Sequence, residues 1–286
     1  MGIGNTTLTA HARRHPSFVA GALLTSLLVA AALFSLLWSP YPPAEIDIPH
    51  KLQTPSPAHW LGTDHLGRDI FSQLLVGAQS SIAVGVMAVG IGLLAGVALG
   101  CLAAAQRASG RAWVDEMLMR AADFTFAFPA LLSAIMLTAV YGPGLLMSMV
   151  AIGIFNVPVF ARIARATASA VWTRDYVTAA RAAGLGPLAI TRWHVLPNIA
   201  SPLTVQATIS FATAILAEAA LSYLGLGTQP PQPSWGRMLN DAQTLIFEAP
   251  LLAVWPGLAI MLSVLGLNLM GDGLRDLLDP RLARQR

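Results

Sequence analysis

Few side chains in this sequence could do chemistry, and those few are acidic or basic groups beside long apolar runs. Asp64, Arg68 and Asp69 lie close together in a stretch rich in Gly and Pro, where they predict either an internal ion pair or a docking site for another protein. Glu218 lies within an apolar run, and an ionisable group at membrane depth is a functional candidate. We expect Glu218 either to line a pathway or to pair with neighbouring structure.

The motifs of common catalytic sites are absent from the sequence. Lys51, the single lysine, follows His50, so the chain cannot contain a phosphate-binding loop that ends in Gly-Lys-Ser/Thr. Neither His-Glu-x-x-His nor Gly-x-Ser-x-Gly occurs. His50, His59 and His65 match no standard metal-ligand spacing. We therefore expect no catalytic residues, no metal site and no cofactor bound by this chain.

A polar segment between two apolar runs predicts a rigid corner. Thr173 or Asp175 can cap a helix start, and the Ala-rich residues 176–183 favour a helix. Gly184 suits the left-handed position that ends a helix, and Pro187 suits the first turn of the next one. The segment therefore predicts two short helices that meet at an angle.

The outer surface of this corner is expected to meet another surface. Leu185 is predicted to be exposed at the corner, and Pro197 is predicted to end the second helix. Ala179 and Ala180 keep the first helix slim, so that a second surface can approach closely. The alternative is an amphipathic loop that lies on the inner leaflet of a membrane.

The composition indicates a protein that crosses the membrane several times. Of its 286 residues, 55% are hydrophobic and 11% are charged, whereas soluble domains carry about 25% charged residues. The net charge of +3 is modest, and we read it as a topology signal rather than as the mark of a nucleic-acid partner. Cys101 is the single cysteine and is expected to be a small packing residue.

Six segments are long and apolar enough to span a bilayer. They are residues 18–38, 81–105, 121–140, 145–161, 202–222 and 251–271. The uncharged stretch 124–161 is too long for one span, and the turn-forming residues 141–144 predict a hairpin there. Pro129 and Pro158 are expected to kink the two helices of this hairpin.

The arginines predict the orientation of these spans. The predicted outer segments carry only Lys51, Arg68 and Arg237, whereas the other arginines fall in the tails and in the inner connections. This bias places both termini in the cytoplasm. The run 18–38 exceeds the usual core of a signal peptide, so we interpret it as a retained first span.

The chain is thus expected to be an all-α membrane protein with about six transmembrane helices. Its predicted parts are a cytoplasmic tail (residues 1–17), a first span (18–38), an outer loop (39–79) and a core of five spans (80–286). The core contains an inner loop (162–198) and a second outer loop (223–250).

The inner corner resembles the cytoplasmic loop of permeases from ATP-binding cassette (ABC) importers. Their pattern is Glu-Ala-Ala, three residues, Gly, nine residues, Ile, one residue and Leu-Pro. The matching positions here are Ala179, Ala180, Gly184, Leu196 and Pro197. Thr178 stands where Glu is usual and His194 where Ile is usual. Thr178 weakens the expectation of a salt bridge to the ATPase but leaves the helix–Gly–helix shape intact.

The resemblance extends along nearly the whole chain. Residues 61–69, 217–227, 229–235 and 271–276 are similar to the peptide/nickel branch of the family, and in particular to its second permease subunit, the C component. The resemblance implies a type I ABC importer permease fold in the bacterial inner membrane. It also implies transport of di- or oligopeptides, with nickel, glutathione or another small solute as alternatives.

The resemblance further implies several partners. They are a homologous second permease, two cytoplasmic ATPases that hold ATP and Mg, an extracytoplasmic binding protein and the membrane lipid. The residues expected to contact an ATPase or to shape that contact are Thr178, Ala179, Ala180, Gly184, Leu185, Leu196 and Pro197. Asp64, Arg68 and Asp69 would be the candidate dock for the binding protein. The competing class is a stand-alone ion-coupled carrier that uses Glu218 as a relay.

Overall fold

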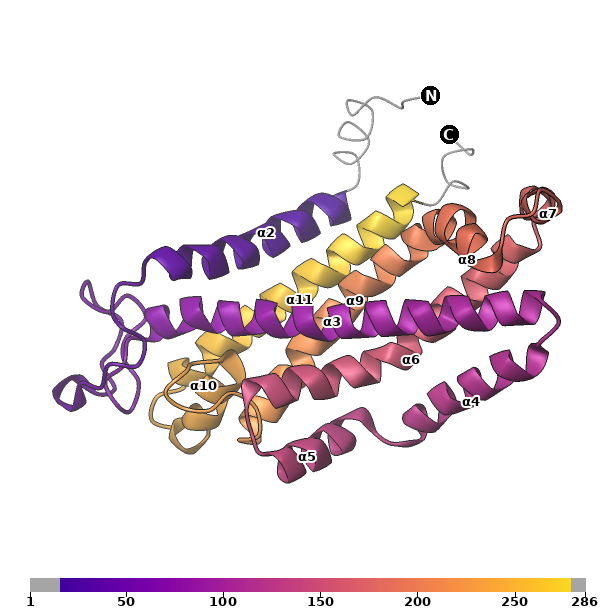
Figure 1. Ribbon diagram of the computed structural model, residues 1–286. Helices are drawn as coiled ribbons and strands as arrows, with labels where there is room; N and C mark the ends of the chain where they lie inside the picture. Colours follow the sequence, from indigo (N-terminus) through magenta and orange to yellow (C-terminus); the bar gives the residue numbers. More distant parts are fainter. Residues whose placement is uncertain (1–15, 279–286) are drawn as a thin grey trace.

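The computed structural model describes residues 16–278, and over this range the chain is a bundle of helices joined by loops (Figure 1). The long helices are α2 (Pro16–Leu37), α3 (Ile70–Ala108), α4 (Ala112–Ala127), α5 (Ala130–Tyr141), α6 (Leu145–Trp172), α9 (Leu196–Tyr223) and α11 (Leu251–Leu278). The short ones are η1 (Ile48–His50), α7 (Asp175–Ala182), α8 (Pro187–Ile190), η2 (Thr191–Val195), α10 (Trp235–Ala242) and η3 (Gln243–Leu245). Within this range five helices are long and apolar enough to cross a membrane, and the bent pair α4–α5 has the length and hydropathy of a sixth, broken span. The predicted all-α membrane fold is confirmed.

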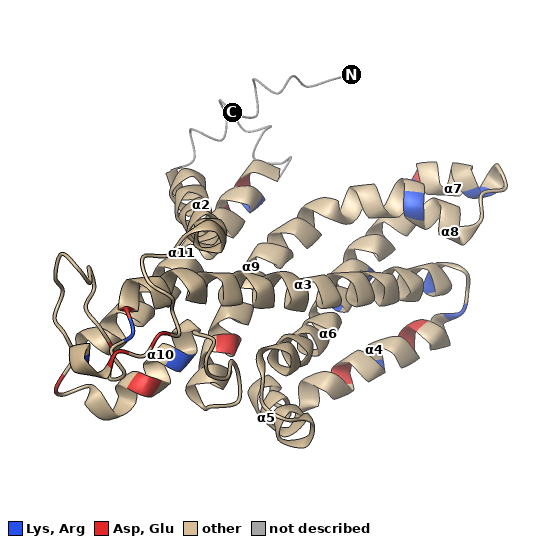
Figure 2. Cartoon of the chain, turned by 60° about the vertical axis from the view of Figure 1, so that its left-hand side comes forward, with Lys and Arg blue, Asp and Glu red and all other residues tan. Residues whose placement is uncertain are grey.

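Helix α3 runs through the middle of the bundle, with α2 and α11 along one edge and α4–α5 along the other (Figure 1). The start of α2, the end of α11 and the short helices α7 and α8 lie at one end of the bundle. Charged residues gather toward the two ends, whereas the middle of α3 carries none (Figure 2). Arg13, Arg14, Arg281, Arg284 and Arg286, like most of the predicted tail 1–17, lie outside the described residues.

Small residues let α3 and α6 lie in close contact. A Cβ atom on Gly96 would come within 2.5 Å of the Val157 carbonyl oxygen, and one on Gly100 within 2.4 Å of the Ala161 carbonyl oxygen. Larger side chains would push the two helices apart, as at other helix interfaces built from small residues. Gly96 and Gly100 therefore set the close approach of α3 and α6 at this seam.

The predicted hairpin is present between α5 and α6. Gly142 and Gly144 have φ values of 93° and 159°, so the chain reverses between the two helices. The expected kink at Pro129 is instead a full break, because α4 ends at Ala127, α5 begins at Ala130 and the two are bent by 82°. Pro129 cannot donate the backbone hydrogen bond that a continuous helix needs.

Two helices extend well beyond the apolar runs that predicted them. Helix α3 begins at Ile70, because the Asp69 side chain accepts a hydrogen bond from the Ser72 backbone N–H and so caps the first turn. Helix α6 continues to Trp172, past the predicted end at 161. Hydropathy marks only the part of a helix inside the bilayer, so these polar extensions were not visible to it.

Candidate functional site

The corner predicted at Gly184 is present and has a well-defined hydrogen-bond pattern. Gly184 adopts a left-handed φ of 88° just after α7. Its N–H donates to the Arg181 carbonyl at 2.9 Å, and the Leu185 N–H donates to the Ala180 carbonyl at 3.1 Å. This pair of bonds is the Schellman motif, which ends a helix by satisfying its last carbonyl groups. We call residues 173–197 the elbow.

The start of α7 differs from the prediction. Arg174 occupies the N-cap position, and no side chain caps the helix, so the predicted capping by Thr173 or Asp175 is wrong. The Thr173 hydroxyl instead donates back to the Ala170 carbonyl of α6 at 3.0 Å. The predicted place of Pro187 in the first turn of the next helix is confirmed.

The prediction that Pro197 ends the second short helix is wrong. Residues Pro187–Tyr223 form one helix of 37 residues, which contains a π-helical turn at Thr191–Val195. In a regular helix the Pro197 ring would clash with the Trp193 carbonyl, four residues earlier. The π turn, in which the Leu196 N–H donates to the Thr191 carbonyl, alters the helix just before the proline. The elbow and the fifth span are therefore continuous.

The inner side of the elbow is packed against the end of α6. Val177, Ile190 and Val195 are at most 1% exposed and share a core cluster with Ala168 and Trp172 of α6. The Arg181 guanidinium lies 4.8 Å from the centre of the Trp172 ring. These contacts hold both short helices on the same support, so that the elbow can move together with α6 and α9.

The outer side of the elbow presents apolar side chains to the surroundings. Leu188 is 83% exposed and Trp193 is 67% exposed. Exposed apolar patches of this kind on a water-facing segment mark interaction sites. Among the residues that the sequence singled out, Ala180 is half-buried and the others are exposed: Thr178, Ala179, Gly184, Leu185, Leu196 and Pro197.

A buried carboxylate near the elbow was not singled out in the sequence. Asp115, in the first turn of α4, is 1% exposed. It accepts hydrogen bonds from Arg165 Nε at 2.9 Å and Nη2 at 2.6 Å, and from Arg107 Nη1 at 3.0 Å. Charge-assisted bonds of this kind are strong, and here they tie α4 to α6 and to the end of α3. Asp115 and Arg165 are 50 residues apart in the sequence, so no local pattern revealed the contact.

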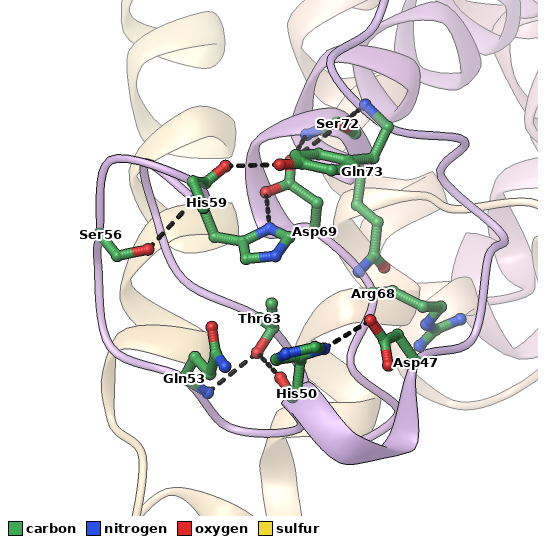
Figure 3. Close-up of polar contacts among 12 residues, drawn as sticks. Asp47, His50, Gln53, Ser56, His59, Thr63, Arg68, Asp69, Ser72 and Gln73 are labelled. Atoms are coloured by element: carbon green, nitrogen blue, oxygen red, sulfur yellow. Dashed lines mark hydrogen bonds and ion pairs between the residues drawn. The ribbon is translucent and has the colours of Figure 1, made fainter.

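The acidic and basic residues of the first outer loop make contacts within the chain. Asp69 accepts hydrogen bonds from Ser72, in the first turn of α3, and pairs with His59 Nδ1 at 3.0 Å (Figure 3). Asp64 accepts hydrogen bonds from Arg68 Nε at 2.6 Å. These bonds fix the fold of the loop where it leads into α3.

Arg68 also reaches the second outer loop. Its Nη2 donates to Asp241 of α10 at 3.1 Å, while Asp64 accepts a further hydrogen bond from Gln73 at 2.9 Å. Asp64 and Arg68 thereby join the two outer loops. The contacts are those of the internal ion pair, and a docking role for the same residues stays a prediction.

Glu218 is enclosed within the chain. Its side chain is 0% exposed, and Oε1 accepts hydrogen bonds from the Ser222 hydroxyl at 2.6 Å and the Thr228 hydroxyl at 3.2 Å. The Ser222 hydroxyl in turn accepts the Thr228 N–H at 2.9 Å. Glu218 thus joins the end of α9 to the turn that follows it, which is the geometry of a structural pairing.

The sequence of this bundle matches a known family of membrane proteins. Residues 96–284 match the model of the binding-protein-dependent transport system inner membrane component. The chain belongs to this family. It is therefore a multi-pass inner-membrane permease of the ABC importer type, as the sequence resemblance indicated.

Curated relatives cover almost the whole permease. It is 46% identical over 268 residues to the di/tripeptide transport system permease protein DppC of Pseudomonas aeruginosa, with 92% of this chain and 87% of that protein covered. It is 42% identical over 264 residues to the dipeptide permease DppC of Alkalihalophilus pseudofirmus, covering 92% and 86%. It is also 42% identical over 271 residues to the glutathione permease GsiD of Pectobacterium atrosepticum, covering 94% and 88%.

A solved structure shows the same fold. The methionine ABC transporter MetNI, in inward-facing conformations, superposes with a TM-score of 0.60 at 19% sequence identity. The match covers 72% of this chain and 97% of the other. The predicted type I importer permease fold is confirmed.

Proposed function

We propose that this permease carries small peptides into the cytoplasm, driven by ATP that separate subunits hydrolyse. The named relatives support the substrate class, because dipeptides, di/tripeptides and glutathione are all short peptides. The chain itself carries no Gly-Lys-Ser/Thr phosphate-binding loop, so ATP and Mg would bind to the partner ATPases.

The elbow is the observation that carries the proposal. Its inner side is anchored by Val177 and Val195, its outer side is exposed at Leu188, and its second helix continues into the membrane as α9. A force applied at the exposed side therefore has a continuous helical route into the bundle. An elbow that lay on lipid for anchorage alone would not need this rigid connection.

Transport then follows from a two-state equilibrium. A second permease would complete the pathway, an extracytoplasmic binding protein would deliver the peptide, and two ATPases would hold the elbows. The closed, ATP-bound pair would favour the outward-facing state through contacts that it makes in that state alone. Shifting such an equilibrium from 1:99 to 99:1 takes about 5.5 kcal/mol of differential binding.

The structure does not favour an ion-coupled carrier that uses Glu218 as its relay. That mechanism needs an ionisable group that a pathway can reach, and Glu218 is 0% exposed with both hydroxyl donors supplied by its own chain. Ionisable residues that serve as proton relays face a bundle interior or a water-filled cavity.

The test is reconstitution of the complete transporter. The permease is co-purified with its second permease and ATPases, placed in liposomes and supplied with the binding protein. We expect uptake of a labelled dipeptide with ATP and none with a non-hydrolysable analogue. Competition by excess tripeptide, glutathione or nickel then ranks the substrate classes. Dipeptide uptake by this chain alone, indifferent to ATP, would refute the proposal.

A further inference from the structure

The break between α4 and α5 lies within the thickness of the membrane. Helix α4 rises from Ala112, at the end of the bundle that also carries the elbow, and Ala127 is about 22 Å further along at 1.5 Å per residue. Helix α5 then leads to the turn at 142–144, at the opposite end of the bundle. The uncharged stretch of this broken span begins at Phe124, so the break that follows Ala127 lies within its apolar part.

No other described part of the chain covers this break. Residues 126–132 are all exposed, although they include the irregular backbone at Phe128 and Pro129. The carbonyl groups of the last turn of α4 lack the partners that a continuous helix would give them. Irregular backbone at membrane depth is tolerated where protein buries it or water lines it, but not against lipid tails.

An exposed ion pair lies beside the break. Asp123 of α4 is bonded to Arg162 of α6, and the two side chains are 58% and 49% exposed. The Arg162 guanidinium also lies 4.4 Å from the centre of the Phe126 ring. The same two helices bury Asp115, at 1% exposure, and leave Glu116 of α4 exposed. Arg162 lies just past the apolar run 145–161, so this exposed ion pair marks where the face meets water or polar protein at the inner end of the span.

We propose that Asp123, Phe126 and Arg162, together with the adjacent break, form a wall of the water-filled pathway between this chain and the second permease. This inference rests on the proposed function. The guanidinium can hold the α-carboxylate of a passing peptide, because its planar donors match a carboxylate. Asp123 offers the complementary acceptor for the peptide amino group. The wall thus suits short zwitterionic peptides.

Cysteine accessibility tests the location of the wall. Cys101 is the single cysteine, so a Cys101→Ala background allows one reporter thiol at a time. Ala127→Cys places it at the break, and Ala30→Cys places it on α2, at the opposite edge of the bundle (Figure 1). Both alanines are exposed in this chain. The probe is a charged, membrane-impermeant methanethiosulfonate, applied from the ATPase side to the assembled transporter.

We expect Ala127→Cys to react at least tenfold faster than Ala30→Cys without nucleotide, and to slow when ATP and vanadate trap the ATPases. Equal slow reaction of both thiols in both states would overturn the inference. ATP-dependent uptake by the unmodified transporter is measured separately. Loss of that uptake refutes the proposed function, whereas slow labelling with intact uptake refutes only the wall.

Peptide end groups test the contact with Arg162. Uptake of a dipeptide is compared with uptake of its C-terminal amide, in the unmodified transporter and in Arg162→Ala, with the same binding protein. Because that protein contributes equally to both measurements, a change in the acid-to-amide ratio reports the permease. We expect the ratio to fall at least threefold in Arg162→Ala and to stay unchanged in Arg120→Ala, an exposed arginine of α4 that pairs with Glu116. An unchanged ratio in Arg162→Ala would exclude the carboxylate contact.

Discussion

The elbow makes a quantitative prediction for Gly184→Ala. Gly184 has a φ of 88°, and a Cβ atom built there would meet no other atom within 4 Å. The substitution therefore adds backbone strain and no clash. An L-residue in the left-handed region costs about 1–2 kcal/mol. This is about a 5- to 30-fold change in the ratio of ordered to altered elbow.

The assay measures peptide imported per ATP hydrolysed in the reconstituted transporter. We expect this ratio to fall in Gly184→Ala, by at most about 5- to 30-fold, following the population of the native elbow, while ATP hydrolysis continues. Gly184→Pro should uncouple the two processes further, because it also removes the N–H that donates to Arg181 at 2.9 Å. Both variants should still insert into the membrane.

Gly186→Ala is the matched control. Gly186 lies two residues away, and a Cβ atom there would also meet nothing within 4 Å. Its φ of −74° and ψ of 162° suit any L-residue, so we expect coupling at the unmodified level. If Gly184→Ala imports as much peptide per ATP as the unmodified permease, or if Gly186→Ala loses as much of this ratio as Gly184→Ala, the corner angle does not carry the coupling.

Three further predictions concern the elbow, the buried carboxylate of α4 and the outer loop. Val177→Ala removes two buried carbons and should lower the stability of the elbow by about 1.6 kcal/mol, which local hydrogen exchange would report as faster exchange. The exposed Leu188→Ala should leave hydrogen exchange unchanged and weaken ATPase binding. Asp115→Asn should destabilise the permease by about 1.5–3 kcal/mol in thermal unfolding, because two partly exposed arginines lose their shared carboxylate, whereas the exposed Glu116→Gln should cost less than about 1 kcal/mol. Asp64→Asn should loosen both outer loops and speed their proteolysis without changing ATP hydrolysis; protease resistance equal to that of the unmodified chain would contradict the ion-pair role.

The sequence predicted the features that depend on neighbouring residues. Hydropathy located the spans, and the positive φ required at the end of α7 made Gly184 readable as a corner. Pro197 misled because its effect depends on the π turn before it, which relieves the clash that normally stops a helix. A rule that considers the proline alone takes no account of the π turn that precedes it.

Contacts between segments far apart in the sequence could not be predicted, for a different reason. Arg165 and Asp115 meet only because α4 and α6 pack side by side, and Arg68 reaches Asp241 across 173 residues. Glu218 and Ser222 are one helical turn apart, so that pair could have been read from spacing. Thr228 joins them only after the chain turns back at the end of α9.

The unbroken run from Pro187 to Tyr223 leaves little freedom to change its length. Each residue added to a helix rotates everything beyond it by about 100° and shifts it by 1.5 Å. An insertion between the elbow and Glu218 would turn one end away from its partners while the other end kept them. The π turn at Thr191–Val195 already holds one extra residue of this kind, so deleting a single residue there would rotate the elbow relative to α9. Members of the family that share both the elbow packing and the Glu218 contacts should therefore keep the number of residues between Gly184 and the second outer loop.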